Sequence, residues 1–141
     1  MTQPSSNINQ EPIKRNSALE MLVSVFPDLK LHWESYIKSE YQNYSEERLD
    51  YVDIGEIIRY IVEKKKYNDT SRFEVFFNRV ETILVNGDDY TKELIVIGLL
   101  EGIQNVCGFD VDYYTGFNDW LKPETKRAWE ELIHFWEGNK Q

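Results

Sequence analysis

Apolar residues recur at the spacing of an α-helix over most of the chain. Leu19, Leu22, Val23 and Phe26 follow an i, i+3, i+4, i+7 pattern, and Pro27 marks its end. Similar stripes predict further helices over residues 29–37, 53–66, 71–86 and 123–138. Three helix starts are predicted from capping-box pairs, which are Ser17 with Glu20, Asp53 with Glu56, and Ser71 with Glu74.

Residues 89–106 predict the most buried helix of the chain. This segment is apolar on nearly every side, which is typical of the centre of a bundle. Gly98 and Gly102 lie one turn apart, and because glycine disfavours a helix we expect a neighbouring helix to approach closely there. We expect Gly87, just before this helix, to adopt a left-handed cap, and residues 116–121 to form one short helix.

These elements predict an all-α fold, a single-domain bundle of about six or seven helices. Stacked helical hairpins over residues 53–85 and 71–106 are an alternative arrangement within that class. The polar residues 1–15 are expected to be a disordered N-terminal segment, and residues 16–141 to form the single helical domain.

Composition narrows the classes of function. The chain has 141 residues, is 41% hydrophobic and carries a net charge of −9, which argues against direct binding of nucleic acid or of an anionic membrane. The longest apolar run, residues 94–100, is far shorter than the roughly 20 residues that span a bilayer. With one cysteine and no secretory signal pattern, the sequence predicts a cytoplasmic protein.

Few residues offer catalytic or metal-binding chemistry. Glu131 and His134 form only half of a di-metal motif, and His32 has no matching acid three residues earlier. Cys107 stands between an apolar helix end and Asp110 and Asp112, which should raise its pKa and make it a poor nucleophile. We therefore expect no enzymatic activity, no cofactor and no metal site, with a small-molecule site at Glu131 and His134 as a minor alternative.

Two segments carry a resemblance to known proteins. The first is formed by Ile95, Gly98, Leu99, Leu100, Glu101, Ile103, Gln104 and Asn105, and the second by Leu121, Pro123, Glu124, Ala128, Trp129, Leu132, Phe135 and Trp136. Both resemble a little-characterised family of small, acidic, all-helical bacterial proteins, some of them similar to immunity proteins that accompany secreted toxins. The resemblance implies a helical fold and an accessory role, and it implies no catalytic residues.

The negative charge is concentrated in one part of the sequence. Residues 73–121 hold nine carboxylates against two basic residues, a net charge of −7 out of the total of −9. Loop aromatics interleaved with carboxylates are typical of an interface toward a basic partner, although the same rings could close the end of the helical core. The candidate partner-binding residues are Asp88, Asp89, Asp110, Asp112, Tyr113, Tyr114, Phe117, Asp119 and Trp120.

These observations favour a non-enzymatic protein-binding module. Its most concrete form is an immunity protein that neutralises a basic toxin by occluding the active site, with nucleases as the favoured target class, since nuclease sites are basic. The alternative is a helical regulatory or scaffold protein that self-associates, as a homodimer, through its acidic aromatic segment.

Overall fold

The computed structural model describes residues 11–42 and 47–138 of the chain. Over these residues the chain forms six helical rods and no strand, which confirms the predicted all-α single domain. None of the described helices is long and apolar enough to cross a membrane. The rods are α2 (Arg15–Val23), α3 (Pro27–Glu40), α4 (Asp50–Asp53) with α5 (Gly55–Lys66), α6 (Phe73–Asn86), α7 (Asp89–Glu93) with η1 (Leu94–Leu100) and α8 (Glu101–Cys107), and α9 (Pro123–Gly138).

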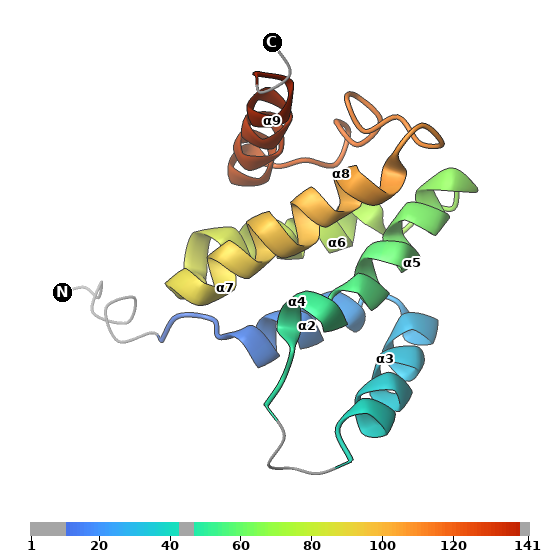
Figure 1. Ribbon diagram of the computed structural model, residues 1–141, viewed down its shortest axis with the longest axis vertical. Helices are drawn as coiled ribbons and strands as arrows, with labels where there is room; N and C mark the ends of the chain where they lie inside the picture. Colours follow the sequence, from blue (N-terminus) through green and yellow to red (C-terminus); the bar gives the residue numbers. More distant parts are fainter. Residues whose placement is uncertain (1–10, 43–46, 139–141) are drawn as a thin grey trace, which may run out of the picture.

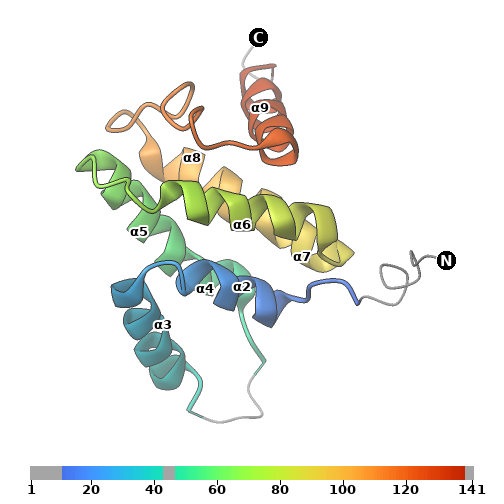
Figure 2. The same cartoon turned by 180° about the vertical axis from the view of Figure 1, so that it is seen from behind.

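A continuous rod of α7, η1 and α8 runs through the middle of the molecule (Figure 1). The helix α6 lies alongside this rod, α9 covers one side of the pair, and α2, α4 and α5 cover the other (Figure 2). Within the rod, Leu94, Ile95, Leu99, Leu100 and Ile103 are fully buried. The prediction of a central buried helix is therefore confirmed.

The centre of this rod has a feature that the sequence did not indicate. Its middle section, η1, is a π-helix, a wider form that is rare and usually short. Of the two glycines nearby, Gly102 behaves as expected, because a Cβ there would overlap the Ile58 side chain. A Cβ at Gly98 would make only an ordinary contact with the Tyr51 ring, at 3.4 Å, and its tighter contact would be with Leu94 of the same rod, at 3.1 Å. Gly102 therefore lets α5 approach the rod closely.

The predicted hairpins are formed only in part. Over residues 71–106, α6 does pack against the rod that follows it. The helix α5 packs mainly against α8 rather than α6, and α6 also packs against α9 and α2, so the hairpin over residues 53–85 is not a principal contact of this bundle.

Several helix ends that were predicted from local sequence motifs differ from those of the structure. The helix α2 begins at Arg15, before Ser17, and α6 begins at Phe73 without a side-chain cap. Asp53 ends α4 and is buried, so it does not cap α5. Residues 116–121 form turns rather than a helix. For Asp53 the reason is tertiary, because its carboxylate accepts hydrogen bonds from the Tyr36 and Tyr41 hydroxyls instead of capping a helix.

The N-terminal segment is attached to the bundle where the structure describes it. The predicted disordered segment falls in part outside the described residues, which begin at residue 11, and residues 11–15 lie against the helices that follow. The Ile13 amide donates to the Asn86 carbonyl at 2.9 Å, and the Asp88 amide donates to the Ile13 carbonyl at 3.0 Å. This bridge holds the chain against the turn between α6 and α7.

That turn also explains Gly87, whose predicted left-handed conformation is wrong. Its φ of −75° and ψ of 160° are extended and open to any residue. A Cβ at this position would lie 2.7 Å from the Ile83 carbonyl oxygen, so space rather than backbone conformation requires glycine.

We predict that Gly87→Ala lowers the free energy of unfolding by about 1–3 kcal/mol, because a backbone atom must move to admit the methyl group. The matched control is Gly138→Ala, where no atom lies within 4 Å of the added Cβ. Urea denaturation should show less than about 0.5 kcal/mol of change in the control. Equal stability of the two variants would contradict the conclusion that position 87 has no space for a Cβ.

The start of α9 is capped by a side chain from α6. The Glu81 carboxylate accepts hydrogen bonds from the Glu124 amide at 3.0 Å, and from the Thr125 amide and hydroxyl at 2.9 Å each. Burial raises the pKa of Glu81, but these hydrogen bonds outweigh it, and the pKa lies below its ordinary value. This cap fixes α9, and with it the end of the loop that precedes α9.

We predict that Glu81→Gln lowers stability by about 0.5–2 kcal/mol near neutral pH, the range for loss of a helix cap. Because the folded pKa is lower than the unfolded one, this stabilisation is present above the unfolded pKa and is lost as the pH falls through the folded pKa. Denaturation at several pH values should therefore show the difference between the two proteins shrinking below about pH 4.5. A difference that is independent of pH would argue against the charged cap.

Candidate functional site

Most of the candidate partner-binding residues lie in the loop of residues 108–122, which links α8 to α9 at one end of the central rod (Figure 1). It leaves α8 at Gly108, whose φ of 53° is left-handed and suits glycine. The Asp112 carboxylate then organises the turn, accepting from the Thr115 hydroxyl at 2.8 Å and the Tyr114 amide at 2.9 Å. These hydrogen bonds lower the pKa of Asp112, and the bond from the Thr115 hydroxyl has the largest effect.

One of the predicted contact residues belongs to the core. The Phe117 side chain is fully buried, with its ring centroid 5.2 Å from that of Trp129 and 6.3 Å from that of Phe73. Trp120 is half-buried edge-on against Phe73, with centroids 5.1 Å apart. Including Phe117 in the interface is therefore a wrong prediction, because its ring closes the core and is out of reach of a partner.

The two tyrosines lie at the boundary between core and surface. Tyr113 is half-buried, and its carbonyl accepts a hydrogen bond from Trp129 Nε1 at 2.9 Å. Tyr114 is exposed, stacks on Tyr113 with centroids 4.7 Å apart and donates its hydroxyl to Glu137 at the end of α9. This contact joins the loop to the C-terminal part of α9.

At this end the chain exposes apolar and acidic side chains together. Phe109 is fully exposed, and Asp110 beside it is also exposed. On α9, the partly exposed Trp136 donates through Nε1 to Glu101 at 2.9 Å. We call this region the aromatic–acidic surface, and its members are Phe109, Asp110, Asp112, Tyr114, Trp136 and Glu137. The last two were not predicted, because only the fold brings α9 to the loop.

Two predicted site residues lie elsewhere. Asp88 caps α7 by accepting from the Thr91 amide at 2.8 Å, and Asp89 follows it. They stand at the opposite end of the rod from Asp110, a separation of roughly 25 Å at the rise of a helix. The acidic residues of segment 73–121 therefore lie on two separate surfaces. Asp119 is exposed on the loop itself.

Part of the negative charge at the loop is balanced from another helix. Lys65, at the end of α5, lies with its Nζ 5.9 Å from the Phe117 ring centroid. It also contributes to lowering the pKa of Asp112. The net charge of residues 73–121 therefore overstates the field that a partner would meet at this surface.

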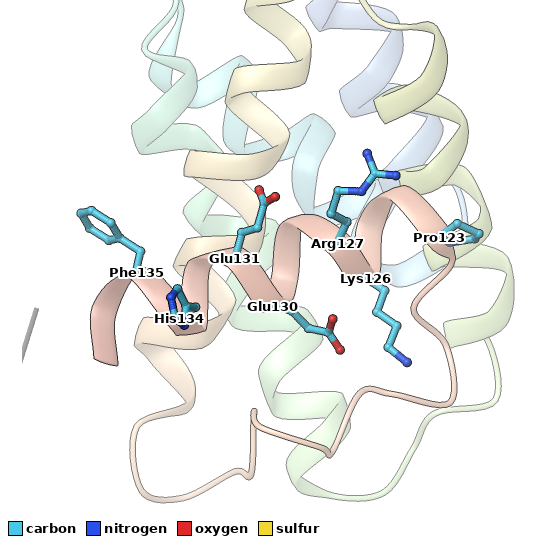
Figure 3. A pocket seen from close by; sticks show the side chains of 7 residues that line it. All are labelled: Pro123, Lys126, Arg127, Glu130, Glu131, His134 and Phe135. Carbon is cyan, nitrogen blue, oxygen red and sulfur yellow. The ribbon is translucent and has the colours of Figure 1, made fainter. Parts of the chain in front are cut away.

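The alternative site around His134 is a shallow face of a single helix. A hollow of about 580 Å³ has all of its lining residues on α9. Figure 3 shows Arg127 and Glu131 pointing to one side of the helix and Lys126 and Glu130 to the other. Within residues 11–42 and 47–138, no second element lines this hollow with Glu131 and His134.

The remaining candidate groups are engaged in structural contacts. His32 Nε2 lies 2.6 Å from a carboxylate oxygen of Glu56. Among residues 11–42 and 47–138, no three His, Cys, Asp or Glu side chains are grouped as metal ligands. Cys107 is buried, and burial raises the pKa of its thiol to about 11.

The structure contains a buried polar cluster that the sequence analysis did not predict. Asp53 accepts from the hydroxyls of Tyr36 at 2.8 Å and Tyr41 at 2.7 Å, and Asp50 accepts from the Tyr90 hydroxyl at 2.7 Å. A signal was present, because Asp53 shares the helical spacing of the buried residues that follow it. Desolvation, together with the hydrogen bond to Asp53, raises the pKa of Tyr36. The hydrogen bond to Asp50, together with desolvation, raises the pKa of Tyr90 to about 12.

We predict that Cys107 resists alkylation by iodoacetamide at pH 8 in the folded protein and reacts readily in denaturant, because the reactive form is the thiolate. Mass spectrometry of the modified chain measures the extent. Rapid alkylation of the folded protein would contradict the buried, protonated thiol.

Comparison with known proteins adds one assignment. A family model described as "Domain of unknown function (DUF7674)" matches residues 19–137, which is most of the chain and all of the elements from α3 to α8. No curated protein and no solved structure matches the chain. The chain therefore belongs to the DUF7674 family of uncharacterised domains.

Proposed function

We propose that this chain is a non-enzymatic binding protein that holds a basic protein partner on its aromatic–acidic surface. The observation that carries the proposal is Phe109, a fully exposed aromatic side chain directly followed by an exposed carboxylate. An exposed aromatic ring offers a large apolar area to bury, and carboxylates around it steer a cationic partner.

The contacts of the loop support a surface that is already formed before binding. The Asp112 turn, the stacked tyrosines and the bond from Tyr114 to Glu137 fix the loop against α9. Phe117 beneath the loop anchors it to the core. A surface that is rigid beforehand loses less conformational entropy when a partner docks.

In its specific form, the proposal is that of a cytoplasmic bacterial immunity protein whose partner is a toxin, with a nuclease as the favoured class. An acidic inhibitor competes for the basic surface with which a nuclease holds phosphates. This form rests on the charge and on the family resemblance described above.

Self-association is the alternative, favoured by the exposed Phe109 and Tyr114. It requires two like-charged surfaces to meet, which costs free energy. Sedimentation velocity separates the two: a dimer lost in Phe109→Ser supports self-association, and a monomer supports a different partner.

We predict that Phe109→Ser and Asp110→Lys each weaken partner binding by about tenfold or more, since both remove central contacts. The partner is captured from extracts of the native host with the purified chain as bait and measured by calorimetry. Asp110→Lys should also slow association, most strongly at low salt.

The matched control is Asp89→Lys, which makes the same change of charge at the far end of the rod. It should leave the affinity unchanged. If Asp89→Lys weakens binding as much as Asp110→Lys, net charge rather than this surface recruits the partner. Capture of no basic protein by the wild-type bait would overturn the proposal.

A further inference from the structure

A small pocket lies beside the aromatic–acidic surface, where α8, the loop and α9 meet. Its volume is about 160 Å³, below the roughly 300 Å³ of sites that enclose a whole small molecule, so it suits one inserted side chain. The lining residues are Gln104, Asn105, Tyr113, Ile133, Trp136 and Glu137. Trp136 and Glu137 belong to the aromatic–acidic surface, so a partner docked there reaches the pocket.

One wall of the pocket is a buried amide. Gln104 is 5% exposed, and its side-chain nitrogen donates to the Trp129 carbonyl at 3.1 Å. No donor from residues 11–42 or 47–138 bonds to its side-chain oxygen. Because the bond to Trp129 fixes the amide, this oxygen is available to a donor that enters the pocket.

The aromatic side chains of the pocket are held by contacts of their own. Trp136 donates through Nε1 to Glu101 at 2.9 Å, and the Tyr113 ring stacks on Tyr114 with centroids 4.7 Å apart. The face of an aromatic ring attracts a cation, and a ring that is already fixed loses little entropy when the cation binds.

The charged groups at the pocket are carboxylates. Glu137 lines it, and Glu101 lies beside it through the bond to Trp136. Each carboxylate accepts a hydrogen bond from a neutral donor, the Tyr114 hydroxyl or the Trp136 indole. In the described part of the chain, no ion pair joins either carboxylate to a basic residue, and no basic residue lines the pocket. The pocket therefore favours a cation.

We propose that this pocket receives an arginine side chain of the basic partner. The guanidinium stacks on Trp136 and donates to the Gln104 oxygen and the Glu137 carboxylate. Arginine fits better than lysine because it combines a flat face with five donors, whereas lysine is a compact charge. This inference rests on the proposed function and adds the type of residue that the partner inserts.

The first test needs no partner. Amide NMR spectra of the full chain are recorded with N-acetylarginine amide, N-acetyllysine amide and N-acetylcitrulline amide, which has the shape of the arginine probe without its charge. The arginine probe should shift signals of residues 104–105, 113 and 133–137 with a saturating dependence on concentration. The citrulline probe should bind about tenfold more weakly, the effect of losing a charge-assisted hydrogen bond. No shift with the arginine probe, or equal affinity for either of the other two, would overturn the proposal.

A charge variant tests the role of the carboxylate. Glu137→Gln keeps an oxygen that can accept from Tyr114 and removes the charge, so it should weaken binding of the arginine probe by about tenfold. The matched control is Glu130→Gln, which removes an exposed carboxylate of the same helix outside the lining. It should bind the probe as the wild type does. Equal weakening in the two variants would show that the general negative field, and not the pocket, holds the probe.

A second variant fills the pocket and leaves both carboxylates in place. Asn105 is exposed, so Asn105→Phe should preserve the fold, which the amide spectrum away from the pocket checks. It should abolish binding of the arginine probe. Unchanged affinity in Asn105→Phe places the probe elsewhere and refutes the site.

The same variants separate this inference from the proposed function. Asn105→Phe and Glu137→Gln should each weaken binding of the captured partner by about tenfold. A partner that binds both variants as tightly as the wild type, but binds Phe109→Ser weakly, refutes the inserted arginine and leaves the aromatic–acidic surface standing. Capture of no basic partner overturns the proposed function, whereas the probe measurements decide by themselves whether the pocket selects a guanidinium.

Discussion

The rest of the molecule depends on the burial of the rod formed by α7, η1 and α8. Most of its apolar side chains are removed from water by the other helices, which pack around it and leave one face with Ile97 and Val106 exposed. Gly102 sets how closely α5 approaches, because a Cβ there would overlap the Ile58 side chain. The length of the rod also separates the two ends of the molecule, and this separation divides the acidic residues into two surfaces.

The surface proposed for the protein partner is held by groups that are themselves buried. Phe117 and the Glu81 cap fix the loop and α9 at one end of the rod, and the exposed Phe109 belongs to this loop. Contacts inside the fold thus position side chains at the surface, which is how a small helical domain can present a defined site.

Periodicity predicted the helices well because it reports which positions must leave water. It did not predict their partners, and the closest pairs join helices distant in the chain, such as α5 with α8. Capping signals failed for the same reason: Asp53 was read as a cap, whereas the tyrosines of α3 and of the segment after it engage its carboxylate in the interior. A local motif cannot show whether a tertiary partner will compete for the same atoms.

The sequence by itself determined the all-helical class, the central buried helix and the concentration of acidic and aromatic residues, because these follow from composition and spacing. The tertiary structure alone decided which of those residues a partner can reach. In the fold, Phe117 is buried, and Asp88 and Asp89 lie at the far end of the rod. Lys65 lies beside the loop, and α9 places Trp136 and Glu137 near the loop. The physical reason is that the exposure of a side chain and the electrostatic field around it depend on distances in space. A count of charges along the chain gives no information about those distances.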